Sequence, residues 1–368
     1  MVNLSPINDL LNSAIEEQHF PGAVYLIVEN SETKAFEALG NAVVVPEIIA
    51  ARTDTIYDLA SLTKPLVTAL LCVQLSEGGK LVVNSPVATY LPEFNIEDKR
   101  EITVQQLLTH CSGLPAWQPL YAEVKSPTDV LPHIANIKLE NEPGTKVVYS
   151  DLGYITLGKM IERMTGADLA EYAAQKIFKP LGLNDTCFNP HLSLQPRIAA
   201  TEEGNKYESA MAGDAGKDYS GWRNAMIWGE VHDGNAYFLG GVAGHAGLFA
   251  TASDILKIAR QFLPGSNLLK PESLPLFSTN FTPGCGVDRS VGWSLATNKT
   301  SAGSHISRTA FGHSGFTGTS LWIDPEKTRI FILLTNRVHP RRSDFDMDEL
   351  RREFHNRAVD WLDKENTG

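Results

Sequence analysis

A serine and a lysine stand three residues apart where a polar segment meets a long apolar run. They are Ser61 and Lys64, in the stretch DLASLTKPLVTALLCVQL at 58–75. A serine hydroxyl becomes an effective nucleophile only when a neighbouring group takes its proton. Residues three apart share one face of a helix, and the helix N-terminus favours developing negative charge. The pattern therefore indicates a nucleophile, Ser61, with Lys64 as its partner.

An ordinary helix cap beside a snorkelling lysine would give the same spacing. Against this, Lys64 opens a run that is apolar nearly all round, where lysine is seldom found without a reason. As a base, Lys64 would have to be neutral, which requires burial or a cationic neighbour to lower its pKa. A second match, Ser31 to Lys34, lies in a polar turn with no helix behind it, and we interpret it as chance. The spacing alone leaves both interpretations of Ser61 open.

Two further segments carry polar groups suited to the same chemistry. VVYSDLGY places Tyr149 just before a helix expected to begin near Ser150 or Asp151. A tyrosine in a cleft can relay protons, whereas Asp151 is also a good helix N-cap. FGHSGFTGTSLWIDP, at 311–325, places an HSG triplet on a glycine-flanked strand. Glycine in a strand often marks the close approach of a ligand, although a sharp turn into an edge strand is the alternative.

Together these segments resemble the serine beta-lactamase and penicillin-binding-protein superfamily, whose S-x-x-K element has a catalytic serine. The resemblance is greatest to the group with class C beta-lactamases, D-alanyl-D-alanine carboxypeptidases and family VIII esterases. It rests on SLTK at 61–64, YSD at 149–151 and HSG at 313–315, in the family's order. Supporting text includes LLTHCSGLP at 107–115 and GGVAGHAGLFATASD at 240–254. The similarity extends from about residue 20 to about residue 340.

The resemblance implies a role for each motif. Ser61 would be acylated, and Lys64 and Tyr149 would share general-base and general-acid duty. The backbone N–H groups of Ser61 and Phe316 would form the oxyanion hole, where loss of one donor typically costs about 10²–10³ in rate. No metal or organic cofactor is implied. The substrate-binding residues would be Asp151, His313, Ser314, Gly315 and Phe316.

Two positions depart from the lactamase pattern. The second motif commonly ends in asparagine, which can donate to a substrate carbonyl, whereas ionised Asp151 can only accept. A carboxylate near Lys64 would also favour the ammonium form, so either Asp151 points elsewhere or the chemistry on the amide side differs. The third motif often begins with lysine, but His313 is mostly neutral near pH 7 unless a neighbour holds its proton. Histidine occurs in the carboxypeptidase and esterase branches, so these changes argue against efficient beta-lactamase activity rather than against membership.

The distribution of strands and helices predicts a mixed α/β (α+β) fold. Strands are expected at 22–30, 34–45, 292–297, 319–325 and 329–338, and helices near 58–81, 153–166, 253–263 and 344–362. We therefore expect an antiparallel sheet from the N- and C-terminal segments, flanked by helices, with a mostly helical inserted lobe. The whole chain, 1–368, would be a single beta-lactamase-like domain. Its sheet lobe would comprise 1–57 and 288–368, and its helical lobe 58–287, with the ligand site in the cleft between them.

Composition restricts the partners. The 368 residues carry a net charge of −11 and contain no long basic run. Such a surface repels phosphate backbones, so a nucleic-acid partner is not expected. No apolar stretch approaches the roughly 20 residues of a membrane span, and residues 1–20 do not read as a secretory signal. The sequence as it stands predicts a cytoplasmic protein, or a periplasmic or extracellular one if a leader has been removed. Oligomeric state is left open.

Several other residues have competing interpretations. His110 is expected to be structural. His232, Asp233 and His245 match no compact zinc spacing, so we interpret their segment as a loop bordering the cleft. Ser314 is not a nucleophile-elbow serine, because residue 316 is phenylalanine and G-x-S-x-G is not met. Three loop tryptophans could shape an acyl pocket or simply pack, namely Trp117, Trp222 and Trp228.

These observations predict a serine hydrolase that works through an acyl-enzyme on Ser61. Its substrates would be small esters, D-amino-acyl peptides or beta-lactam-like compounds. One alternative is a catalytically impaired relative that binds peptide or acyl ligands, supported only by Asp151. Another is an acyltransferase that uses the same acyl-enzyme with an alcohol or amine as acceptor.

Overall fold

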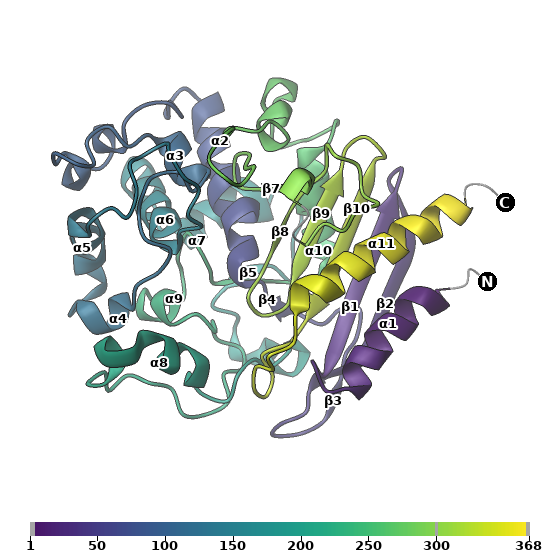
Figure 1. Ribbon diagram of the computed structural model, residues 1–368. Helices are drawn as coiled ribbons and strands as arrows, with labels where there is room; N and C mark the ends of the chain where they lie inside the picture. Colours follow the sequence, from purple (N-terminus) through teal and green to yellow (C-terminus); the bar gives the residue numbers. More distant parts are fainter. Residues whose placement is uncertain (1–3, 299–300, 366–368) are drawn as a thin grey trace.

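The computed structural model describes residues 4–298 and 301–365. Its main sheet has seven antiparallel strands in the order β3-β2-β1-β10-β9-β8-β7, so the two ends of the chain meet at its centre (Figure 1). A small sheet has the order β4-β6-β5. The predicted sheet of N- and C-terminal segments is confirmed. The strands are β1 (Gly22–Glu29), β2 (Glu32–Val43), β3 (Ile49–Ala50), β4 (Tyr57–Asp58), β5 (Cys187–Phe188), β6 (Leu248–Ala250), β7 (Ser294–Leu295), β8 (Phe311–Ser314), β9 (Ser320–Asp324) and β10 (Arg329–Thr335).

The centre of the sheet is buried on both faces. Every residue of β1 is buried, and β1 pairs with β2 on one side and β10 on the other. Successive strand residues face opposite sides. Ala23, Tyr25 and Ile27 accordingly join one apolar cluster, while the residues between them join the larger one. This explains why β1 reads as a continuous apolar run rather than an alternating one.

Helices cover both faces of the sheet. Terminal helices α1 (Ser5–Glu16) and α11 (Met347–Glu365) lie side by side on one face (Figure 1), where Leu11 and Phe354 share a cluster with Phe331 of β10. On the other face α10 (Ala252–Ala259) contacts β1 and β10. The remaining α-helices are α2 (Leu70–Glu77), α3 (Val104–Leu108), α4 (Leu120–Glu123), α5 (Val130–Asn136), α6 (Asp151–Thr165), α7 (Leu169–Ala173), α8 (Lys206–Ala212) and α9 (Gly234–Phe238).

The helix expected at 58–81 is not regular. A 3₁₀ turn at Ala60–Leu62 leads into a π-helical stretch, Lys64–Ala69, and only then into α2. Pro65 has no N–H to donate, and the Thr68 hydroxyl bonds across to the Gly244 carbonyl at 2.7 Å. Such π segments are frequent at functional sites. The irregularity lies directly behind Ser61.

Two boundaries near the C-terminus differ from the prediction. The strand expected at 292–297 shrinks to β7, because Gly292 has a left-handed conformation (φ 82°) and a 3₁₀ turn begins at Ala296. The last helix begins at Met347 rather than near 344. The Asp346 carboxylate accepts from the backbone N–H of Asp348 and of Glu349, which fixes the start of the helix. The division into two lobes at 57/58 and 287/288 stays a prediction.

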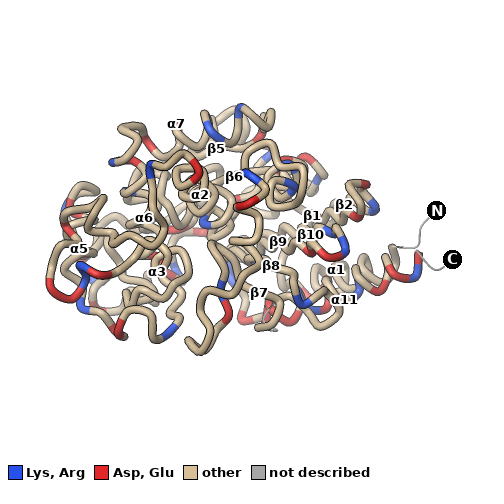
Figure 2. The backbone as a smooth tube through the Cα atoms, turned by 90° about the horizontal axis from the view of Figure 1, so that it is seen from above, with Lys and Arg blue, Asp and Glu red and all other residues tan. Residues whose placement is uncertain are grey.

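Acidic and basic residues are interspersed along α11 and around α5 and α6 (Figure 2). Mixed charge of this kind is ordinary for a protein surface. Among the helices of the described residues, none is long and apolar enough to cross a membrane.

Asn336, just after β10, ties three central strands together, and its replacement should destabilise the fold. Its buried side chain accepts from the Gly22 N–H at 3.2 Å and donates to the carbonyls of Ala42 at 2.8 Å and Asn41 at 3.4 Å. Asn336→Ala should lower the free energy of unfolding by about 2–4 kcal/mol, because buried backbone groups lose their partners. Urea denaturation measures this. Exposed Asn95→Ala is the control, and equal stability of the two variants would contradict the prediction.

Candidate active site

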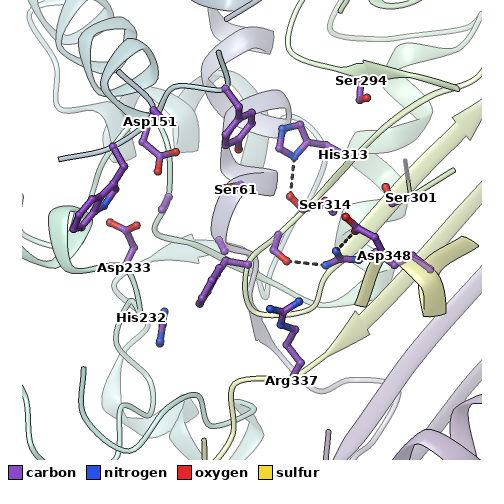
Figure 3. A pocket seen from close by; sticks show the side chains of 18 of the residues that line it. Ser61, Asp151, His232, Asp233, Ser294, Ser301, His313, Ser314, Arg337 and Asp348 are labelled. Carbon is purple, nitrogen blue, oxygen red and sulfur yellow. Dashed lines mark hydrogen bonds and ion pairs between the residues drawn. The ribbon is translucent and has the colours of Figure 1, made fainter. Parts of the chain in front are cut away.

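Ser61 opens into a cavity of about 580 Å³ (Figure 3). All three predicted motifs contribute to its wall, although Lys64 lies buried behind Ser61 rather than in the wall itself. Segments from residue 60 to residue 351 therefore converge on one site. Those used below are Ser61, Trp117, Tyr149, Asp151, His232, Asp233, Arg289, His313, Ser314, Gly315, Phe316, Arg337, Asp348 and Arg351.

A buried carboxylate fixes the turn that presents Ser61. Asp58, on β4, accepts from the N–H of Ala60 and from that of His232, each at 2.8 Å. Burial raises the pKa of the Asp58 carboxyl, and the two N–H groups oppose that effect. Ala60 has a left-handed conformation (φ 46°), which is uncommon for alanine and is typical of strained functional turns. Asp58 thus ties the turn that holds Ser61 to the segment at His232.

Lys64 is completely buried and has three oxygen partners. Its Nζ donates to Ser61 Oγ at 2.9 Å and to the His245 carbonyl at 3.1 Å, and lies 2.7 Å from Asp151 Oδ1. Burial disfavours the ammonium form, but Asp151 and Tyr149 outweigh it, so the pKa of Lys64 is raised above its ordinary value. In this state Lys64 is an ammonium that donates to Ser61. To act as a base in this state, Lys64 would need a pKa below its ordinary value rather than above it.

Asp151 points at Lys64 because another residue caps the helix. Ser150 is the N-cap of α6: its Oγ accepts from the Gly153 N–H at 3.2 Å and donates to the Pro115 carbonyl at 2.6 Å. The interpretation of Asp151 as the N-cap is therefore wrong. As the first residue of α6, Asp151 is free to turn its carboxylate towards the ammonium.

Tyr149 lies between two cations. Lys64 Nζ is 4.9 Å and the Arg289 guanidinium 5.4 Å from the centre of its ring. Its hydroxyl is buried, and Tyr149 contributes to the raised pKa of Lys64. The His110 ring lies 4.4 Å from the Tyr149 ring, and its Nδ1 accepts from the Ser150 N–H at 2.9 Å. His110 thus supports the second motif, which fits its predicted structural role.

His313 is a buried, neutral histidine. Its Nδ1 donates to the Ser314 carbonyl at 2.9 Å, and its Nε2 has no partner in the described part of the chain. Burial, reinforced by the charges of Arg289 and Lys64, holds the pKa of His313 well below its ordinary value. His313 therefore does not supply the fixed positive charge that lysine gives in the lactamase pattern.

The turn after β8 is tied to the segment that precedes Ser61. The Thr317 hydroxyl donates to the Asp58 carbonyl at 2.7 Å, and the Thr319 hydroxyl to the Leu59 carbonyl at 3.1 Å. A Cβ on Gly315 would lie 2.1 Å from Thr319 Oγ1, so only glycine fits there. Within the described residues the Phe316 N–H has no backbone acceptor. It is left available beside the Ser61 turn.

The family is decided by comparison with known proteins. The family model described as beta-lactamase matches residues 7–356. The chain belongs to the beta-lactamase family. Within that family it is similar, at 33% identity, to an Escherichia coli K12 protein provisionally named a D-alanyl-D-alanine carboxypeptidase and to an N-acetylmuramyl-L-alanine amidase of Bacillus subtilis strain 168. Each match covers 87% of this chain, and 79% and 78% of those relatives respectively.

Solved structures agree on the fold. EstCE1, a hydrolase with promiscuous acyltransferase activity, superposes with a TM-score of 0.75 at 21% identity, over 96% of this chain and 97% of its own. A class C beta-lactamase gives 0.74 at 16% identity, over 95% of each chain. Membership in the family makes this protein a serine hydrolase, as the sequence predicted.

Arg289 is a site residue that the sequence did not reveal in this beta-lactamase-family protein. It lies in the loop before β7, lines the cavity and has no carboxylate partner among the described residues. Its charge contributes to the low pKa values of His110 and His313. Arg289 thus supplies the fixed positive charge that His313 lacks. The only signal in the sequence was one arginine in a glycine-rich loop, GCGVDRSVG, which has no diagnostic spacing.

Asp233 and His245 extend the network around Lys64. His245 Nε2 lies 2.9 Å from Asp233 Oδ1, which also caps α9 through the Ala236 N–H. Ligand atoms of Asp151, Asp233 and His245 all lie within 4.8 Å of one another. The Lys64 ammonium, paired with Asp151 and bonded to the His245 carbonyl, already places a positive charge at this cluster. We therefore interpret Asp151, Asp233 and His245 as parts of a polar network around the Lys64 ammonium.

The structure also shows where His232 and the three loop tryptophans lie relative to the cavity. His232 stacks on Phe316 at 5.6 Å between ring centres and borders the cavity as predicted. Of the three tryptophans, Trp117 lines the cavity. Trp222 packs against tyrosines and Trp228 donates to the Ile198 carbonyl, so both are packing residues.

The charge state of His313 gives a testable prediction. At pH 6 an ordinary histidine is mostly protonated, since its pKa is about 6.5. His313 should remain neutral at that pH, because burial and two cations lower its pKa. Imidazole ¹⁵N NMR measures this, with His313→Gln to assign the signal. Arg289→Gln removes one of the cations and should raise the pKa of His313. A protonated His313 at pH 6 in the wild type would contradict the assignment.

Proposed function

We propose that Ser61 is the acylated nucleophile of a hydrolase for D-amino-acyl peptides and related amides with a carboxylate near the scissile bond. Small esters would serve as simpler substrates. The observation that carries the proposal is the 2.9 Å contact between Ser61 Oγ and Lys64 Nζ, in a cavity that Arg289 also lines. Oxyanion stabilisation is assigned to the N–H groups of Ser61 and Phe316. Ser314 and Gly315 would border the substrate along the edge of β8.

The proton of Ser61 needs an acceptor, and an ammonium cannot be one. We assign that task to the Lys64–Asp151 pair. Lys64 passes a proton to Asp151, 2.7 Å away, and then accepts the Ser61 proton as Oγ bonds to the substrate carbonyl carbon. The carbonyl π electrons move to the oxyanion. This makes the carboxylate at position 151 a working part of the site rather than a defect of the motif.

The leaving group is assigned to the side of the cavity where Tyr149 and Arg289 lie. When the tetrahedral intermediate collapses, the C–N or C–O bond breaks and the Tyr149 hydroxyl protonates the departing atom. Lys64 and Arg289 beside the Tyr149 ring stabilise the phenolate that this step creates. Water then attacks the acyl-enzyme, and reversed proton transfers release the acid and regenerate the side chains.

The substrate class is proposed from the charges that face the cavity. Arg289 offers a guanidinium suited to a carboxylate on the leaving-group side. One relative is named for D-alanyl-D-alanine, a substrate of this kind, and the other for N-acetylmuramyl-L-alanine, whose name supports an amide substrate only. Because Asp151 is paired with Lys64 and cannot donate while ionised, the asparagine-type contact to a substrate carbonyl is missing. Efficient beta-lactam hydrolysis is therefore not proposed.

Ser61→Ala should abolish turnover. Hydrolysis of p-nitrophenyl acetate should fall at least about 10³-fold, since the nucleophile is lost. Mass spectrometry after treatment with a fluorophosphonate should show one adduct on wild type and none on Ser61→Ala. The matched control is Ser31→Ala, in the other serine–x–x–lysine match, which should behave as wild type. An adduct that persists in Ser61→Ala would contradict the assignment of the nucleophile.

Asp151→Asn tests the proton relay. Without the carboxylate, burial dominates and the pKa of Lys64 should fall. If Asp151 receives a proton during acylation, the acylation rate should drop by about 10²-fold at any pH below the new pKa of Lys64, because the ammonium then has no acceptor for its proton. Stopped-flow measurement of the acylation burst separates this step from deacylation. A variant that acylates as fast as wild type would remove Asp151 from the relay while leaving Ser61 as nucleophile.

A further inference from the structure

Arg337 reaches the cavity from a segment that no motif includes. It lies two residues beyond β10, and its N–H donates to the Thr317 carbonyl at 3.0 Å. Its guanidinium lies 5.5 Å from the centre of the Phe316 ring and lines the cavity that contains Ser61. In Figure 3, Arg337 points into this space from the side opposite Asp151. The guanidinium is thus positioned beside the turn that carries the Phe316 N–H.

The neighbouring arginines have partners, whereas Arg337 does not. Arg351 donates to Asp348 at 2.8 Å and to the Gly315 carbonyl at 2.8 Å. Arg342 lies 3.9 Å from Asp344 and stacks over the Tyr207 ring. Among the described residues, no carboxylate pairs with Arg337 and no acceptor receives a hydrogen bond from its guanidinium. A half-buried, unpaired guanidinium is costly, so the position favours an anion from outside the chain.

The charges around Arg337 favour a second anion there, apart from the one assigned to Arg289. Burial and the charges of Arg351 and Arg342 lower the pKa of Arg337 to about 10, which still leaves it charged at neutral pH. The wall across Ser61 carries the carboxylates of Asp151 and Asp233. The wall around Arg337 carries Arg337 and Arg351 against one carboxylate, Asp348, which is paired with Arg351, so its net charge is positive. An anionic group would be repelled from the first and drawn to the second.

We propose that Arg337 binds a carboxylate in the acyl part of the substrate. This rests on the proposed function, in which the leaving group lies on the side of Tyr149 and Arg289. Arg337 packs instead on Phe316, at the far end of the proposed oxyanion turn, so a group that it binds belongs to the half that remains on Ser61. The planar guanidinium matches a carboxylate in a bidentate arrangement. The preferred substrates are acyl compounds with a carboxylate a few bonds from the scissile carbonyl.

The test compares two esters that differ in one charge, mono-p-nitrophenyl glutarate and its methyl ester. Wild type should have the higher kcat/KM for the acid. Arg337→Gln should lower the ratio of kcat/KM for the acid to that for the methyl ester by about 10- to 100-fold, the usual effect of losing a hydrogen bond to a charged group. Arg337→Lys should restore part of the ratio. Thermal melting verifies that each variant is folded.

Arg341→Gln is the matched control, because it removes the same charge from an exposed side chain outside the cavity lining. Its ratio should equal that of wild type. An unchanged ratio in Arg337→Gln, or an equal loss in Arg341→Gln, would overturn the subsite while leaving Ser61 chemistry intact. A wild type that hydrolyses neither ester would overturn the proposed function and the subsite with it.

Discussion

The arrangement of the site depends on one buried ion pair, between Lys64 and Asp151. An ammonium without a partner at a completely buried position would cost several kcal/mol. Here the cost is offset by a carboxylate at 2.7 Å, the Ser61 hydroxyl and the His245 carbonyl. Each partner comes from a different segment of the chain. The ammonium therefore determines how the start of α6, the loop before β6 and the Ser61 turn fit together.

Other buried polar groups fix the positions of the loops and turns around Ser61. Asp58 links the Ser61 turn to the loop at His232 through two backbone N–H groups. Thr317 and Thr319 fasten the turn after β8 to the same segment, and the buried Arg351 of α11 binds that turn from behind. Donors that are fixed before the substrate arrives need no reorganisation during the reaction, which is the main source of electrostatic catalysis. The sheet and its terminal helices provide the rigid support that such an arrangement requires.

The sequence predicted what depends on local pattern. It predicted strands at 22–30 and 329–338, which are β1 and β10, and the spacing of Ser61 and Lys64 identified the pair now found in contact. It did not predict the charge on Lys64, because that charge depends on where Asp151 points. Asp151 points inward because Ser150 caps α6, a choice between two adjacent good caps that propensity does not decide. Arg289 was missed since it lies in a loop whose path is set by tertiary contacts alone.

The central claim is that Lys64 is an ammonium in the resting protein, and ¹⁵N NMR of its side chain tests this most directly. Protein labelled with ¹⁵N-lysine would be titrated from pH 6 to pH 11, with Lys64→Arg used to assign the signal. The account predicts that the Lys64 resonance keeps its ammonium shift beyond pH 10.5, the ordinary lysine value, because Asp151 and Tyr149 outweigh burial. A Lys64 that loses its proton below about pH 9 would be an ordinary buried base, and the relay through Asp151 would be wrong.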